Sequence, residues 1–210
     1  LAMSSAASDV YKRQPLPSHL QASSRLLLEC ITPKKDVDGL TSYSMGQLTA
    51  NPEHNTCPVP CTASAITKLL TYYNITVTGK HAVVVGASNI VGRPTALSLL
   101  AKLATVTVCH SKTQNLADHV RACDILVVAI GNPHVISSNW LHEKQIVLDI
   151  GINHNKEGKI IGDIPKEAHQ VVSAITPVPG GVGPMTVACL VDNLFTLFEK
   201  SLYEDRQNPT

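Results

Sequence analysis

Four short apolar runs, separated by helical patterns, constrain the fold of this chain more than any other feature. Each run is rich in β-branched residues and has no polar face, which is typical of strands buried on both sides of a parallel sheet. Strands that alternate with helices along a chain predict an α/β fold, here a Rossmann-like, doubly wound parallel sheet. The predicted strands are His81–Gly86, Thr105–Cys109, Asp124–Ile130 and Gln145–Ile150, with predicted helices at Arg93–Leu103 and Leu116–Ala122.

Two more helices are expected outside this alternation. Residues Ala63–Tyr73 place Ile66, Leu69 and Leu70 on one apolar face, with Thr62 as the expected N-cap. Met185–Lys200 carries an amphipathic helical pattern near the end of the chain. The segment before it, residues 176–186, packs three prolines and three glycines into eleven residues. We expect neither helix nor inner strand in that segment, but a rigid loop that a planar or anionic ligand can approach closely.

The composition excludes several classes of protein. The 210 residues are 44% hydrophobic and 16% charged with a net charge of +1, so we expect a globular protein without a nucleic-acid partner. The longest apolar runs, such as Ile125–Ile130, are too short to span a bilayer, so we expect no membrane partner. Cys57 and Cys61 lack a second pair at zinc-ligand spacing, which argues against a metal site. Reduced cysteines fit a cytoplasmic location, with a mitochondrial one left open.

A glycine turn between the first predicted strand and its helix predicts a nucleotide site. The segment Gly86–Gly92 lies where a dinucleotide pyrophosphate binds in this architecture, although a full G-x-G-x-x-G is absent and the motif alone is weak. The helix that follows offers backbone N–H groups and a positive dipole end to phosphate. After the second strand, Ser111 and Lys112 stand where NAD enzymes place a carboxylate. This favours NADP as the cofactor, with NAD as the alternative.

Seven motifs stand out along the chain: Pro15-Leu-Pro17, Pro33–Gly39, Pro60-Cys-Thr62, Gly86–Gly92, Thr105–Thr113, Asp149–Asn153 and Thr176–Thr186. Together they resemble the bifunctional methylenetetrahydrofolate dehydrogenase/methenyltetrahydrofolate cyclohydrolase family. The resemblance covers about residues 15–200, and its motifs occur in the family's order. It implies oxidation of 5,10-methylenetetrahydrofolate with NADP and hydrolysis of the 5,10-methenyl product to 10-formyltetrahydrofolate.

The resemblance also implies roles for individual residues. Asp38 matches the carboxylate that binds the pterin, and Pro179 and Gly183 match the loop on the folate side. Carboxylate oxygens suit this role because they can accept two parallel N–H bonds from an amino-pyrimidine edge. The positions that match contacts to the cofactor are Gly86, Ala87, Ser88, Ser111, Ile152 and Thr186. Ala87 is a departure, since the family commonly has arginine there, and this weakens the preference for NADP.

The resemblance places the family's catalytic lysine and glutamine N-terminal to Pro15, so no catalytic residue is assigned in the printed sequence. We therefore expect an N-terminally truncated member with impaired activity; a catalytically silent nucleotide-binding module or partner subunit is the alternative. Tetrahydrofolate derivatives are the expected partners, and the family implies a homodimer. The expected organisation is a non-native leader at 1–14, the remnant of an α/β catalytic lobe at 15–74, the NAD(P)-binding domain at 75–180, and a loop and helix returning to the first lobe at 181–210.

Overall fold

The computed structural model describes residues 28–50, 57–133 and 135–207, which fall into two compact units. The second unit, Thr62–Cys189, contains the large sheet, and the first unit contains the described residues up to Cys61 together with those from Leu190 onward. The expected leader and the Pro15-Leu-Pro17 motif lie outside the described residues. The expected lobes and their boundaries stay predictions.

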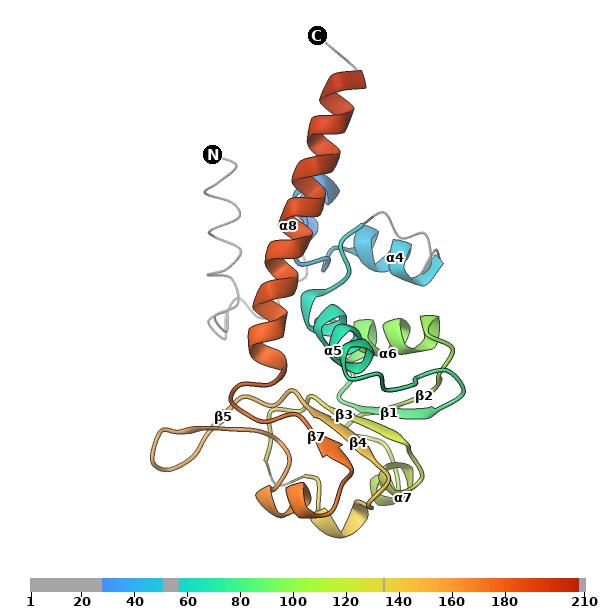
Figure 1. Cartoon of the computed structure of the whole chain (residues 1–210), viewed down its shortest axis with the longest axis vertical. Helices are drawn as coiled ribbons and strands as arrows, with labels where there is room; N and C mark the ends of the chain where they lie inside the picture. Colours follow the sequence, from blue (N-terminus) through green and yellow to red (C-terminus); the bar gives the residue numbers. More distant parts are fainter. Residues whose placement is uncertain (1–27, 51–56, 134, 208–210) are drawn as a thin grey trace. The chain divides into compact units, whose positions relative to one another are not determined.

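The large sheet has five strands, all parallel, and it confirms the predicted fold class (Figure 1). Its strand order is β2-β1-β3-β4-β7, so the chain reverses its direction of travel across the sheet at β1. Helices α6 and α7 accordingly lie on opposite sides of the sheet, as Figure 1 shows. The strands are β1 (His81–Val85), β2 (Thr105–Cys109), β3 (Ile125–Val128), β4 (Ile146–Asp149) and β7 (Ala174–Ile175), and the helices are α6 (Gly92–Ala101) and α7 (Leu116–Arg121).

The core of the second unit explains why these strands are apolar throughout. Val83 and Val85 of β1 pack in one cluster with Val120 of α7, and partly buried Trp140 lies against the same cluster. The intervening residues Ala82 and Val84 are also fully buried, as expected for a strand covered on both faces. Helix α6 packs against β1 and β2.

Short elements outside the main alternation were not predicted. The hairpin of β5 (Asn153–His154) and β6 (Ile160–Ile161) has two residues in each strand, as does β7. Two residues are too few to show a period of two, so pattern reading cannot find them. The other unpredicted elements are η1 (Pro33–Lys35), α4 (Ser42–Ala50), η2 (Ser138–Trp140) and η3 (Lys166–Gln170).

Two helix boundaries differ from the expectations. Helix α5 spans Cys61–Tyr72, so Thr62 lies inside the helix and the expectation that it is the N-cap was wrong. Its predicted apolar face is confirmed by the buried side chains of Ile66 and Leu70. Helix α8 spans Val182–Gln207, so the end of the proline- and glycine-rich segment is helical after all. Pro184 is tolerated there because the N–H groups of a first helical turn have no partner within the helix.

Helix α8 also qualifies the expectation about membranes. The window Val182–Ser201 has a mean hydropathy of 1.2, so by length and composition alone it could cross a bilayer. Uninterrupted apolar runs do not reveal this window, because polar residues interrupt its apolar ones. One such helix is weak evidence, because the core helices of soluble proteins can pass the same test.

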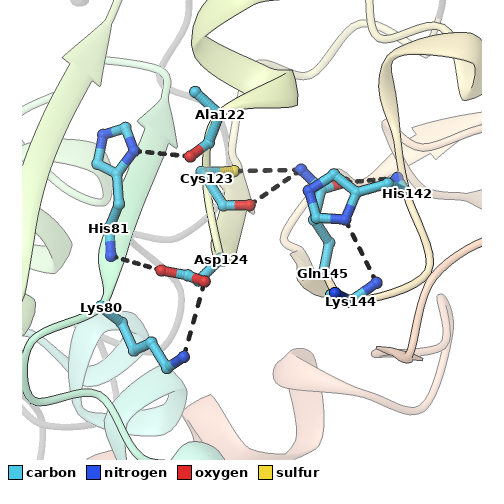
Figure 2. Close-up of polar contacts among 8 residues, drawn as sticks. All are labelled: Lys80, His81, Ala122, Cys123, Asp124, His142, Lys144 and Gln145. Carbon is cyan, nitrogen blue, oxygen red and sulfur yellow. Dashed lines mark hydrogen bonds and ion pairs between the residues drawn. The ribbon is translucent and has the colours of Figure 1, made fainter.

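Polar contacts join the amino ends of the strands (Figure 2). Asp124, just before β3, accepts a hydrogen bond from the backbone N–H of His81 at 2.9 Å and lies 3.7 Å from the Lys80 ammonium. Gln145, just before β4, is fully buried, and its amide donates to the carbonyls of Val120 at 2.5 Å and Cys123 at 3.2 Å. These bonds hold the loops at the edge opposite to the predicted ligand edge.

Candidate functional site

The glycine turn after β1 lies beside β3, at the point where the strand order reverses. Val85 pairs with Cys109 of β2 and with Val128 of β3, so the loops after all three strands begin at one level. The backbone N–H of Gly86 donates to the Cys109 carbonyl at 2.9 Å, which joins the first two loops. Ligands of open α/β sheets bind at this edge, outside the carboxyl ends of the strands.

Backbone crowding requires glycine at both ends of this turn. Gly86 has φ +119°, and a Cβ there would overlap the Ala129 carbonyl oxygen and lie 3.0 Å from its carbon. A Cβ on Gly92 would overlap the Gly86 carbonyl oxygen and lie 2.6 Å from the Gly86 carbonyl carbon. Glycine is thus needed at 86 for the tight turn and at 92 for the close packing of the helix on the strand, as expected from the sequence.

Ser88 precedes helix α6 and binds the backbone at the start of that helix. Its Oγ accepts hydrogen bonds from the backbone N–H groups of Val91 at 3.2 Å and Gly92 at 3.3 Å. Its carbonyl accepts a third bond from Arg93 at 3.0 Å. A hydroxyl that accepts two bonds still has its own proton to donate, and the Ser88 side chain is exposed. This glycine-lined turn thus has two features that suit a phosphate, an exposed hydroxyl at Ser88 and the N-terminus of α6.

The loop after β2 is a tight turn that exposes Ser111 and Lys112. The His110 backbone N–H donates to Thr113 Oγ1 at 2.9 Å, and the Lys112 backbone N–H donates to His110 Nδ1 at 3.2 Å. These bonds leave the side chains of Ser111 and Lys112 at the exposed tip, next to the Gly86 turn. A hydroxyl and an ammonium at this position are suited to a phosphate on the ribose and offer no carboxylate to a free 2′-hydroxyl.

The remaining predicted cofactor residues differ in exposure. Ala87 is half-buried, and Ile152, beyond the end of β4, is 69% exposed at the same edge of the sheet. Thr186 is only 4% exposed, and its hydroxyl donates to the Val182 carbonyl at 2.9 Å within the first turns of α8. The Thr186 hydroxyl is therefore partly engaged by the helix backbone.

The two folate-side candidates of the second unit lie on either side of the start of α8: Pro179 precedes the helix and Gly183 is in its first turn. Both Pro179 and Gly183 are exposed, and the Val178–Pro179 peptide is cis. A Cβ on Gly181 would overlap the Pro177 carbonyl oxygen, whereas a Cβ on Gly183 would meet nothing within 4 Å. The backbone therefore requires glycine at 181 but not at 183.

Asp38, the third folate-side candidate, lies in the first unit. Its Oδ1 accepts a hydrogen bond from the backbone N–H of Cys61 at 3.3 Å, at the start of α5. Asn193 of α8 donates its side-chain amide to the carbonyls of Val37 at 2.9 Å and Val59 at 3.0 Å. These bonds hold the loop of Asp38 against the residues that precede α5.

A second carboxylate, Asp36, shapes the same loop and was missed by the sequence reading. It is 2% exposed and accepts bonds from Thr41 Oγ1 at 2.7 Å and Ser44 Oγ at 2.6 Å. Thr41 Oγ1 in turn accepts from the backbone N–H of Ser44 at 3.3 Å, as an N-cap of α4 does. The spacing of Asp36, Thr41 and Ser44 could have indicated a capped helix start at this point.

Residues 60–202 match the family model "Tetrahydrofolate dehydrogenase/cyclohydrolase, NAD(P)-binding domain". The chain belongs to the tetrahydrofolate dehydrogenase/cyclohydrolase family. It is 50% identical over 193 residues to the bifunctional protein FolD of Neisseria gonorrhoeae, and this match covers 90% of the chain and 65% of that relative.

Solved structures of the tetrahydrofolate dehydrogenase/cyclohydrolase family have the same fold. The bifunctional FolD enzyme of Campylobacter jejuni is 44% identical, with a TM-score of 0.82 over 89% of this chain and 65% of that one. The Trypanosoma brucei enzyme, solved with NADP cofactor and an inhibitor, is 35% identical, with a TM-score of 0.82 over 96% of this chain and 74% of that one. The printed chain thus spans 65% of the length of its Neisseria relative.

Membership of this family leaves the assignments of individual residues as predictions. The catalytic lysine and glutamine are expected N-terminal to Pro15, and residues 1–27 lie outside the described residues. Five of the candidates follow the carboxyl ends of strands of the large sheet: Gly86, Ala87, Ser88, Ser111 and Ile152. Pro179 precedes α8, and Gly183 and Thr186 lie in its first turns.

Proposed function

We propose that this chain is part of a bifunctional enzyme that oxidises 5,10-methylenetetrahydrofolate with NADP and hydrolyses the resulting 5,10-methenyltetrahydrofolate to 10-formyltetrahydrofolate. One observation supports the nucleotide half most strongly. The Gly86 turn lies at the carboxyl edge of a parallel sheet, at its topological switch point, with a helix N-terminus directly after it. The names of the related enzymes support the folate half.

The residues of the second unit would divide the binding of NADP among them. NADP, when bound, accepts the hydride that leaves the folate. Gly86 and Ala87 let the backbone approach the pyrophosphate, and the Ser88 hydroxyl donates to it. Ser111 and Lys112 would bind the 2′-phosphate. Ile152 would supply apolar contact, and Thr186 is a further candidate on the cofactor side.

The folate half of the proposal assigns three residues to the substrate. Asp38 supplies a carboxylate, a group that can accept parallel N–H bonds from the amino-pyrimidine edge of a pterin. Pro179 and Gly183 would lie against the folate as a rigid surface with few side chains. We further propose a homodimer in the cytoplasm, on the strength of the family resemblance and the bacterial relatives.

Isothermal titration of this chain with NADP and with NAD tests the nucleotide assignment. We expect NADP to bind more tightly, and Lys112→Ala to weaken NADP by about tenfold while leaving NAD nearly unchanged, because only NADP carries the 2′-phosphate. Lys102→Ala is the matched control, since Lys102 is also exposed but follows the far end of α6. Equal affinities for NADP and NAD, or equal effects of the two lysine substitutions, would refute the 2′-phosphate assignment.

A further inference from the structure

Two buried aspartates lie behind the carboxyl edge of the sheet and take no part in the function proposed so far. Asp149 ends β4 and is 4% exposed, and Asp163 follows β6 and is fully buried. Buried carboxylates are costly unless their lone pairs are satisfied. The hydrogen-bond partners of these two carboxylates therefore identify the loops that they hold in place.

Asp163 joins two loops of the candidate nucleotide edge. Its Oδ2 accepts hydrogen bonds from the backbone N–H groups of Ile130 at 2.7 Å and Gly131 at 3.0 Å, in the loop after β3. Its Oδ1 accepts a bond from the Asn153 side-chain amide at 2.9 Å. Asn153 directly follows Ile152, a candidate cofactor residue, and its amide also donates to the Gly162 carbonyl at 3.2 Å.

Asp149 holds Asp163 in this position. Its Oδ1 accepts bonds from the backbone N–H groups of Gly151 and Asp163, both at 2.9 Å, and its Oδ2 accepts one from Ile164 at 2.9 Å. Burial raises the pKa of Asp149 above its ordinary value, and the nearby Asp163 raises it further, against the three N–H bonds that lower it.

Two glycines allow the carboxylates to come this close to the backbone. A Cβ on Gly151 would overlap the Asp163 carboxyl group, and a Cβ on Gly162 would lie 2.6 Å from Asp149 Cγ. The two glycines and the two aspartates therefore pack together. Gly151 leaves room for the carboxylate of Asp163, and Gly162 leaves room for that of Asp149.

The loop that Asp163 binds lies directly against the glycine turn. Ala129 precedes Ile130, and its carbonyl lies so close to Gly86 that a Cβ there would overlap it. The Ala129 N–H donates to the Val85 carbonyl at 2.9 Å. Ala129 is therefore the single residue between the Ile130–Gly131 backbone and the Gly86 turn, so a shift of that backbone also moves the turn.

We propose that Asp163 is a positioning residue for nucleotide binding, because it holds the loops after β3 and β4 in place beside the Gly86 turn. This inference rests on the proposed function, since it takes NADP as the ligand of that edge. Asp163 acts on the nucleotide through the backbone of these loops and through Asn153.

The test measures NADP affinity and amide exchange in the same folded protein. In Asp163→Asn the side chain has one oxygen in place of two, so it cannot accept both from Asn153 and from the N–H groups of Ile130 and Gly131. At least one bond of the arrangement must break, and the bonds that remain lose their charged acceptor. We expect the Kd for NADP to rise about tenfold, because a bond to a charged acceptor is lost where the loops meet. We expect the amide protons of Ile130 and Gly131 to exchange faster, while that of Ala129, bonded within the sheet, stays protected.

Asp124→Asn is the matched control. Asp124 also accepts a backbone N–H bond, from His81 at 2.9 Å, but lies at the opposite edge of the sheet (Figure 2). We expect its Kd for NADP to stay within about twofold of the unsubstituted chain. An Asp163→Asn protein that is folded by circular dichroism and binds NADP as tightly as the control overturns the proposal.

A second variant decides the matter if Asp163→Asn does not fold. Asn153→Leu keeps the size of the side chain and removes only its donated bonds, so we expect a rise in Kd of about threefold. Unchanged affinity in this variant overturns the positioning role. If the unsubstituted chain does not bind NADP at all, the proposed function fails and the positioning role fails with it. If the unsubstituted chain binds NADP and the variants bind it equally well, only the positioning role fails.

Discussion

Adding one methyl group at Gly92 tests the geometry of the nucleotide turn. In Gly92→Ala the new Cβ would lie 2.6 Å from the Gly86 carbonyl carbon and 3.2 Å from the Ala87 Cα, and would overlap the Gly86 oxygen. Non-bonded carbons normally lie about 3.5–4.0 Å apart, so the turn or helix α6 must move by about 1 Å. Neither side of this contact is a flexible side chain, so the backbone must absorb the whole shift.

The magnitude follows from two opposing terms. Insertion of a methyl group into a close-packed site costs about 1–3 kcal/mol, and this site is at the upper end because both partners are backbone. Alanine favours a helix over glycine by about 0.5–1 kcal/mol, which offsets part of the cost. We therefore expect the free energy of unfolding of the second unit to fall by about 2 kcal/mol. We expect affinity for NADP to fall at least tenfold, since the displaced turn carries the Ser88 hydroxyl and the Gly86 backbone.

Urea unfolding followed by Trp140 fluorescence measures this change. Trp140 is the single tryptophan of the chain and lies against the core of the second unit, so it reports on that unit. Gly183→Ala is the control, because Gly183 is also in the first turn of a helix but has nothing within 4 Å of an added Cβ. We expect the control to be neutral or slightly stabilising. Equal unfolding free energies for the two variants would refute the inferred crowding at Gly92.

Two further predictions concern buried polar and thiol groups. Gln145→Leu should lower the unfolding free energy by about 3 kcal/mol, because it leaves the carbonyls of Val120 and Cys123 without this partner in the interior; urea unfolding measures it, with exposed Lys144→Ala as a control expected to change little. Burial raises the pKa of Cys123 from 9.0 to about 12, so at pH 8 iodoacetamide should modify exposed Cys30 but not Cys123 in the folded chain, as peptide mass spectrometry would show. Because the folded thiol holds its proton more tightly, its contribution to stability is present below about pH 9 and is lost as pH rises toward 12; modification of folded Cys123 at the same rate as Cys30 would contradict this burial.

The sequence was sufficient for four of the five strands of the large sheet and for the turn that carries the nucleotide proposal. Apolar runs without a polar face identified β1 to β4 within two residues of their observed ends. The glycines at 86 and 92 were predictable because their need arises within one strand–turn–helix unit, over seven residues of chain. Helix ends were less predictable: Thr62 resembled an N-cap, yet α5 begins one residue earlier, where the Asp38 carboxylate binds the N–H of Cys61.

The sequence by itself determined the class of fold, the family and the place of the glycine turn. These features depend on hydrophobic periodicity and on backbone conformation, and both are set by residues that are close together in the sequence. Tertiary structure alone decided which polar side chains hold the loops at the two edges of the sheet. Asp163 accepts a hydrogen bond from Ile130, 33 residues away in the sequence, and Gln145 donates one to Val120, 25 residues away. No local sequence pattern predicts contacts at such separations. These pairings exist because β1, β3 and β4 are neighbours in the sheet, which brings the loops at each edge into hydrogen-bond reach.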